Sequence, residues 1–292
     1  MKFCFTAGIS LFCYASIVSA APRPLFAAAS KDLGSTTKAG HHGHSHKYPA
    51  EIQELFKGNI AFRKNMTNHG PDFLKSLAVD GQKPPFMVID CSDSRSSEEA
   101  IFSVKPGTMF TTGNIANQFH EEDLTTNAVL SYAVETLAVK HVILMGHYGC
   151  GGVAAAMAPL GEKPTHPAHC AVQEWIKPIR DVYQRSERPE IIAHRKKMLK
   201  SPTQKAPGLH DPAFRALVEE NVKANVRRIA DSAVIQDHFA ALSAGSDELQ
   251  KTEVHIHGWV YDIENGEVTD LGITFGPSGL IEDGSPFKKS KY

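Results

Sequence analysis

The chain has 292 residues, a formal net charge of −1 at pH 7, 42% hydrophobic residues and 22% charged residues. This length allows one large domain or two small ones, and the composition is that of a globular protein that buries a core without disulfide staples. A net charge so close to zero attracts neither nucleic acid nor an anionic membrane surface, so we expect no partner of either kind.

The N-terminus has the pattern of an export signal. Lys2 supplies a minimal basic region, residues 3–18 are mostly apolar, and Ser19-Ala20-Ala21 offers the small side chains that a signal peptidase needs. No other stretch approaches the roughly 20 apolar residues of a membrane-spanning helix. We therefore predict a signal peptide over residues 1–20, secretion, and no membrane span; a short membrane anchor or a buried strand is the alternative.

Residues 21–48 contain much Pro, Ala, Ser and Gly without apolar periodicity, which is typical of a flexible leader. The leader includes the histidine cluster HHGHSH at 41–46. The cluster could collect metal ions, but a solvated tail is the simpler interpretation, and we assign it no catalytic role. Folded structure is expected over 49–292 as a single domain.

An apolar stripe near the start of this domain predicts a helix. Its members are Ile52, Leu55, Phe56, Ile60 and Phe62. Asn65-Met66-Thr67 is a glycosylation sequon, which is meaningful because the chain is expected to be secreted. Whether a glycan occupies it stays open.

The next part of the domain reads as alternating strands and helices. The residues from Phe86 to Asp90 form a short apolar run typical of a buried parallel strand, and a helix over 124–139 has Asp123 or Thr125 as its cap. Further strands are predicted over 109–112 and 141–145, and a further helix over 153–157. Strand, helix and strand of these lengths form a βαβ unit. We therefore predict an α/β fold with a central, mainly parallel β-sheet flanked by helices.

The last part of the chain contributes fewer elements. Residues 159–210, rich in Pro, Lys and His, are predicted to be loops around one helix near Trp175. Asp211 and Pro212 open a helix whose apolar stripe runs to Ala233. Residues 254–263 alternate in polarity and turn towards Val268, which predicts a hairpin.

Two polar motifs follow two of the predicted strands directly. Cys91 begins CSDSR, and His147 and Cys150 lie in GHYGCGG. The carboxyl ends of parallel strands meet at one edge of a sheet, where ligand sites gather. Two thiolates and an imidazole, with the carboxylate of Asp93 nearby, suit a tetrahedral Zn²⁺ site. The alternative is a small buried cysteine and a hydrogen-bonded histidine without metal.

A second group of metal-binding residue types lies in the Pro-rich region. It consists of His166, His169 and Cys170. No predicted strand anchors it, so we rank it below the first group. Cys170 has no assigned role: a disulfide to a second chain and a buried inert thiol both stay open.

CSDSR at 91–95, followed by SYAVETLAVKHVILMGHYGCGG at 131–152, resembles the β-class carbonic anhydrase family. KPGTMFTTGNIAN at 105–117 and HGWVYDIENG at 257–266 are similar to further segments of that family. The resemblance spans roughly Pro49 to Phe275, so that 49–292 would be the catalytic domain. Where the family often has Arg, this chain has Gly113, so the resemblance says little about pocket polarity or an accessory bicarbonate site.

The resemblance implies a zinc lyase that reversibly hydrates carbon dioxide to bicarbonate and a proton. One Zn²⁺ per chain would be held by Cys91, His147 and Cys150, and Asp93 and Arg95 would be the catalytic dyad. Zinc-bound hydroxide would be the nucleophile, and the chains would assemble as a homodimer or a dimer of dimers.

The dyad also has a physical rationale. Two thiolates neutralise Zn²⁺ and weaken it as a Lewis acid, so the bound water needs a hydrogen-bond acceptor such as Asp93. Arg95 can keep that carboxylate ionised and correctly turned, although a surface pair worth less than ~1 kcal/mol is the plain alternative. If the pair opens, Asp93 could become the fourth zinc ligand and close the site.

Three other functions stay open. They are hydrolysis of a related linear molecule such as carbon disulfide, non-catalytic binding of zinc or bicarbonate, and thiol redox chemistry. The last is disfavoured because the chain lacks a Cys-x-x-Cys spacing.

Overall fold

The computed structural model describes residues 49–159, 166–202, 205–244, 252–281 and 285–290. The chain divides into two units, Met1–Asn59 and Ile60–Tyr292. The predicted signal peptide, the leader and the histidine cluster at 41–46 lie outside the described residues. Among the helices that the structure describes, none is long and apolar enough to cross a membrane.

Helix α1 (Ala50–Thr67) confirms the helix predicted near Pro49. None of its residues is buried. Its stripe of large apolar side chains is between 40% and 72% exposed: Ile52, Leu55, Phe56, Ile60 and Phe62. Asn65, the sequon asparagine, is exposed in the last turn of this helix. A second helix, α2 (Phe73–Asp80), follows and was not predicted.

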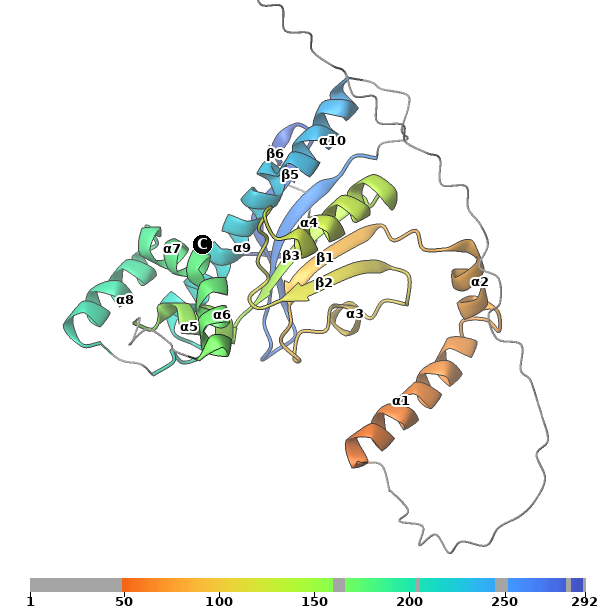
Figure 1. The fold of residues 1–292 in the computed structure, drawn as a ribbon, viewed down its shortest axis with the longest axis horizontal. Helices are drawn as coiled ribbons and strands as arrows, with labels where there is room; N and C mark the ends of the chain where they lie inside the picture. The colour runs from red at the N-terminus through yellow and green to blue at the C-terminus, as the bar shows by residue number, and fades with distance from the viewer. Residues whose placement is uncertain (1–48, 160–165, 203–204, 245–251, 282–284, 291–292) are drawn as a thin grey trace, which may run out of the picture. The chain divides into compact units, whose positions relative to one another are not determined.

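A single sheet forms the centre of the second unit, in the order β2-β1-β3-β4-β5-β6 (Figure 1). The parallel strands are β1 (Phe86–Cys91), β2 (Met109–Asn114), β3 (His141–His147) and β4 (His255–Tyr261). Strand β5 (Val268–Gly276) runs antiparallel to β4, β6 (Gly279–Ile281) antiparallel to β5, and β7 (Lys288–Lys289) parallel to β5. The predicted α/β fold with a mainly parallel sheet and the predicted hairpin are confirmed.

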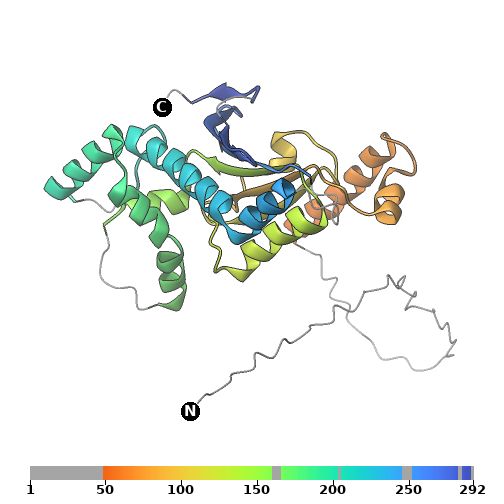
Figure 2. The ribbon, with the colours of Figure 1, turned by 90° about the horizontal axis from the view of Figure 1, so that it is seen from above.

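The main core lies between the sheet and helix α9 (Pro212–Asp231), which packs on β3, β4 and β5. Figure 2 shows α9 and α10 (blue) and α4 (lime) side by side along one face of the sheet. Along β4, buried Ile256, Gly258 and Val260 alternate with partly exposed residues, as expected for a strand with one face in the core. A smaller cluster around Val88 and Ile143 covers part of the opposite face.

The helix predicted over 124–139 is shorter and changes its winding. Helix α4 (Leu124–Ser131) is followed by a π-helical turn, η1 (Tyr132–Thr136). Asp123 is its cap, because the Asp123 carboxylate accepts a hydrogen bond from the N–H of Thr125 at 3.1 Å. The N–H of Leu137 bonds to the carbonyl of Tyr132 five residues back, and the backbone then leaves the helix at Ala138 with φ +52°.

The prediction of one helix within 159–210 is wrong. The described residues there form α6 (Pro167–Trp175), α7 (Lys177–Arg185) and α8 (Pro189–Lys200). Each of these helices has a proline in its first turn, where the missing N–H costs nothing. The prolines that suggested loops therefore mark helix starts.

The long C-terminal helix was predicted to continue to Ala233, but α9 ends at Asp231. Ser232 has an extended backbone, and a separate helix, α10 (Ala233–Ser243), starts after it. Two further short helices are α3 (Glu98–Ile101) and α5 (Gly151–Met157), and α5 confirms the helix predicted over 153–157.

Candidate metal centre

The three sulfur and nitrogen ligands predicted from the sequence lie together at the carboxyl edge of the sheet. Cys91 ends β1 and His147 ends β3, and these two strands are parallel neighbours. Cys150 lies three residues after His147, at the N-cap of α5. The ligand atoms of the three residues all lie within 4.8 Å of one another, and all three residues are buried. Within the described residues, no other group of this kind is found.

The geometry of this group fits a tetrahedral zinc ion. The two Sγ atoms are 3.9 Å apart, close to the ~3.8 Å expected for two thiolates that share an ion at a Zn–S distance of about 2.3 Å. The Nδ1–H of His147 donates to the carbonyl of Tyr148 at 3.0 Å, which assigns the lone pair to Nε2. That Nε2 is buried and has no hydrogen-bond partner, as expected of a metal ligand.

The acidity of Cys91 also favours the binding of a cation by these three residues. The thiol of Cys150, the imidazole of His147 and the N–H of Ala116 (3.3 Å from Sγ) lower the pKa of Cys91 to about 4. The shared proton and burial raise the pKa of Cys150. Burial alone would lower the pKa of His147, but the close contact with Cys91 and the charge of its thiolate raise it. Cys91 thus favours the thiolate form, which is the form that would bind a divalent cation.

Asp93 and Arg95 form a two-pronged ion pair beside the ligands. Arg95 donates from Nε to Oδ1 of Asp93 at 2.8 Å and from Nη2 to Oδ2 at 2.7 Å. These bonds hold the pKa of the Asp93 carboxyl well below its usual range. Oδ2 of Asp93 lies 3.7 Å from Nε2 of His147. The carboxylate therefore stays ionised next to the metal-ligand atoms while it is bound to Arg95.

The pair is joined to the second ligand turn. Nη2 of Arg95 lies 3.4 Å from the carbonyl of Gly149, which it approaches as a weak donor. Gly149 has φ +78°, a conformation that favours glycine, and it lets the chain turn from His147 to Cys150. The motif on β1 and the motif on β3 thus form one site.

Gly113, the position that departs from the family pattern, lies opposite Asp90 in the sheet. A Cβ atom at Gly113 would lie 3.1 Å from Oδ1 of Asp90 and 3.4 Å from Oγ of Ser92. Burial and the nearby charge of Glu98 raise the pKa of Asp90 to about 8. A buried carboxyl therefore borders the place where the family often has an arginine.

The second group of metal-binding residue types does not form a site. His166 caps α6, and its Nδ1 accepts a hydrogen bond from the N–H of Ala168. The rings of His166 and His169 are 5.5 Å apart between centroids. Cys170 is exposed, so the interpretation of it as a buried inert thiol is wrong.

Sequence reasoning missed two residues that contact the ligands directly. The N–H of Ala116 reaches Cys91 Sγ, and the carbonyl of Tyr148 accepts from His147. Both contacts are made by backbone atoms, which every residue has, so the identity of the side chain does not predict them. Only the position of Tyr148, between the two ligands in GHYGC, gave a hint of its role.

Comparisons with known proteins agree with this geometry. A family model described as carbonic anhydrase matches residues 86–268. A carbonic anhydrase of Emericella nidulans is 32% identical over 79% of this chain and 86% of its own length. The β-carbonic anhydrase CafA of Aspergillus fumigatus superimposes with a TM-score of 0.56 at 30% identity, over 81% of this chain and 93% of its own. One of two tetrameric β-carbonic anhydrases of Sordaria macrospora reaches a TM-score of 0.60 at 26% identity, over 77% and 99%.

Proposed function

The chain belongs to the β-class carbonic anhydrase family, and from that premise we propose that it reversibly hydrates carbon dioxide to bicarbonate and a proton, with one Zn²⁺ per chain. Enzymes of this class are carbonate dehydratases. The observation that carries the proposal is the convergence of Cys91, His147 and Cys150, with an unpartnered Nε2 on the histidine. Soft thiolates and an imidazole are the donor set that zinc prefers.

The two thiolates and Nε2 of His147 would hold the ion. When bound, Zn²⁺ supplies a Lewis acid that lowers the pKa of a coordinated water from 15.7 towards ~7. Three protein ligands leave one position for that water, which is the pattern of catalytic rather than structural zinc sites.

Asp93 would accept a hydrogen bond from the attacking water and turn its lone pair towards carbon dioxide. The carboxylate can do this at neutral pH because Arg95 keeps its pKa low and fixes its two oxygens. Arg95 itself is about half exposed, so we assign it an orienting role and not a large contribution to stability.

The proposal is tested by stopped-flow hydration of carbon dioxide, with metal analysis on the same sample. We expect stoichiometric zinc and rapid hydration. Asp93→Asn should keep its zinc but lose roughly 100-fold in kcat, because the hydrogen bond to the nucleophile is lost. Asp123→Asn is the matched control, since asparagine caps α4 as well as aspartate does.

An Asp93→Asn enzyme with undiminished hydration would contradict the assigned role of Asp93. If the wild-type chain binds zinc but does not hydrate carbon dioxide, the chain is either a non-catalytic binder or a hydrolase of a related molecule. Hydrolysis of carbon disulfide by the same sample would favour the hydrolase.

We further propose that Asp93 can leave Arg95 and become a fourth zinc ligand that closes the site. Its Oδ2 already lies 3.7 Å from Nε2 of His147, so a short movement would suffice. The absorption spectrum of the cobalt-substituted protein across pH tests this, and an invariant spectrum would rule it out.

For assembly, we propose a homodimer or a dimer of dimers. The exposed apolar stripe of α1 supports it, as such stripes are normally covered, and the relative from Sordaria macrospora is tetrameric. Light scattering should give an even multiple of the chain mass, and Phe56→Glu should reduce it. A monomer in both samples would contradict the proposal.

For location, we propose secretion after cleavage of residues 1–20, supported by the apolar run and the small residues at 19–21. N-terminal sequencing of protein from the culture medium should begin at Ala21. A mass decrease on glycosidase treatment would show that Asn65, exposed on α1, carries a glycan.

A further inference from the structure

Helix α9 carries a row of buried polar side chains, two of which contact residues that touch the candidate metal ligands. Glu219, Asn221 and Asn225 are 4%, 1% and 0% exposed, on a helix whose other buried residues are nearly all apolar. Burying such groups costs free energy unless each finds a partner. Here the partner of Glu219 is Tyr148, next to His147, and the partner of Asn221 is Ala116, which follows β2 and contacts Cys91.

The first contact chain starts at Glu219 and reaches His147. Oε1 of Glu219 accepts a hydrogen bond from the hydroxyl of Tyr148 at 2.8 Å. The N–H of Tyr148 donates to the carbonyl of Tyr261 at 3.0 Å, so both ends of this residue are held. The carbonyl of Tyr148 is the acceptor for Nδ1–H of His147. Fixing Tyr148 therefore fixes the orientation of the imidazole.

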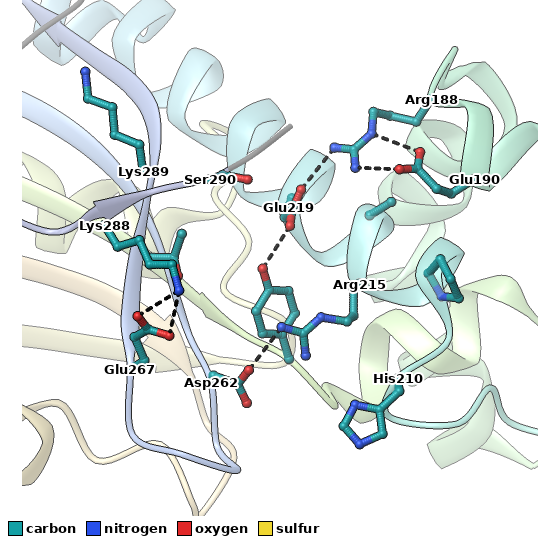
Figure 3. Close-up of a pocket in the computed structure, with 14 residues that line it drawn as sticks. Arg188, Glu190, His210, Arg215, Glu219, Asp262, Glu267, Lys288, Lys289 and Ser290 are labelled. Carbon is teal, nitrogen blue, oxygen red and sulfur yellow. Dashed lines mark hydrogen bonds and ion pairs between the residues drawn. The ribbon is translucent and has the colours of Figure 1, made fainter.

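Two arginines hold Tyr148 and its partner in place; Figure 3 shows Arg188 beside Glu219 and Arg215 beside Asp262. Arg188 donates to Oε2 of Glu219 at 3.0 Å and so holds the carboxylate in place. The guanidinium of Arg215 lies 3.5 Å from the centre of the Tyr148 ring, and its Nη2 donates to Asp262 at 3.0 Å. These side chains line a polar cavity of about 320 Å³ behind the metal ligands.

The second contact chain starts at Asn221 and reaches Cys91. Nδ2 of Asn221 donates to the carbonyl of Ala116 at 3.0 Å, and the N–H of Ala116 donates to Sγ of Cys91. Ala116 and Asn117 have φ of +62° and +47°, which is uncommon for residues with a side chain. Such a backbone persists only when its surroundings hold it, and the bond from Asn221 does so.

We infer that Glu219 and Asn221 are positioning residues for the metal: Glu219 orients His147 through Tyr148, and Asn221 orients Cys91 through Ala116. One helix thereby sets the direction of a ligand on each of the two ligand-bearing strands. The inference rests on the proposed function, because it requires that these residues bind zinc. The inference adds that side chains of α9 raise the affinity of the candidate ligands for zinc by orienting them.

The test is the zinc affinity of the folded full-length chain, measured by competition with a chromophoric chelator. Tyr148→Phe should weaken zinc binding roughly tenfold. This is the lower end of the loss in metal affinity expected when a residue that supports a metal ligand is mutated. Asn221→Leu should do the same. Glu219→Leu should match Tyr148→Phe, and Glu219→Gln should stay within about threefold of wild type, because the amide oxygen still accepts from the tyrosine.

Tyr183→Phe is the matched control. Tyr183 is as buried as Tyr148, at 4% exposure, and its hydroxyl contacts Nδ1 of His194 at 2.7 Å. The substitution removes the same kind of hydrogen bond without touching the ligand turns. Thermal unfolding of every variant measures how much stability each substitution removes. We expect the zinc affinity of the control to stay within about twofold of wild type.

The double variant Tyr148→Phe/Glu219→Leu separates a shared pathway from two independent effects. If both residues act through one hydrogen bond, the double variant loses no more zinc affinity than Glu219→Leu alone. Additive losses would overturn the pathway through Tyr148.

If Tyr148→Phe and Asn221→Leu hold zinc as tightly as Tyr183→Phe does, the inference is wrong while the proposed function stands. Tyr148→Phe removes a single oxygen atom, so it decides the question even if Asn221→Leu fails to fold. A wild-type chain that binds no zinc would overturn the proposed function and this inference with it.

Discussion

Replacing Gly146 with alanine should destabilise the protein through helix α9. Gly146 precedes the ligand His147 on β3, and a Cβ atom there would lie 2.6 Å from Cγ2 of Val222 and 3.3 Å from Oδ1 of Asn117. Carbon atoms in contact prefer about 3.5–4.0 Å, so Val222 must retreat by roughly 1 Å. Val222 is fully buried on α9 and has no free space to move into.

Overpacking of this kind costs about 1–3 kcal/mol. Against this, alanine restricts the unfolded chain and returns about 0.4–1 kcal/mol. We therefore expect a net loss of roughly 1–2 kcal/mol in the free energy of unfolding. A displaced α9 also shifts the supports of His147, so zinc affinity should fall as well.

Gly258→Ala is the matched comparison. Its Cβ would lie 2.7 Å from Cγ2 of Ile273, 3.0 Å from Cγ2 of Val226 and 3.3 Å from Cγ1 of Val222, so the overpacking is similar and again presses on α9. Gly258 lies in the middle of β4 and precedes no ligand. We expect a similar loss of stability and also a fall in zinc affinity, because Val222 and Val226 both belong to α9.

The assay is urea unfolding at a fixed zinc concentration, followed by chelator competition on the folded samples. Wild-type stability in both variants would refute the packing argument. Unchanged zinc affinity in both destabilised variants would refute the link between α9 and the candidate metal ligands.

Three further outcomes are expected. Arg95→Lys loses the two-pronged bond to Asp93, and kcat for hydration in a stopped-flow assay should fall roughly 10–100-fold at unchanged zinc content; an unchanged kcat would contradict the orienting role. Burial and the nearby His141 lower the pKa of His257 to about 4, so the unfolded chain binds a proton between pH 6.5 and 4 that the folded chain rejects. Stability should then decrease as pH falls through this window, and less steeply in His257→Asn, as thermal unfolding at several pH values can show. Removal of zinc by a chelator should abolish hydration and lower Tm, and added zinc should restore both; an apoprotein with wild-type Tm would contradict the coupling between metal and fold.

The sheet and the convergence of Cys91, His147 and Cys150 could be predicted because both depend on local pattern. Apolar runs that end abruptly in Cys91 and at His147 mark buried parallel strands, and parallel strands bring their ends together. No long-range knowledge was needed for that step.

The elements that were missed depend on contacts between distant segments or on local exceptions. Prolines open three helices within 166–202, and a π-helical turn follows Ser131 where a continuous helix was predicted. Glu219 and Asn221 look like ordinary polar residues in a helical sequence. Their partners at Tyr148 and Ala116 are far away along the chain, so only the folded structure shows why polar side chains are buried there.

The placement of the supports on α9 has a consequence for the order in which the protein is made. A nascent chain presents both cysteine ligands once residue 150 has been synthesised, but α9 ends only at Asp231. At ~5–20 residues per second, the ribosome needs about 4–16 s to complete that stretch. During this interval His147 lacks the carboxylate and Cys91 the amide that would later position them, and if the chain is secreted as proposed, oxidation of the thiols would compete with metal capture. Early docking of α9 would end that competition.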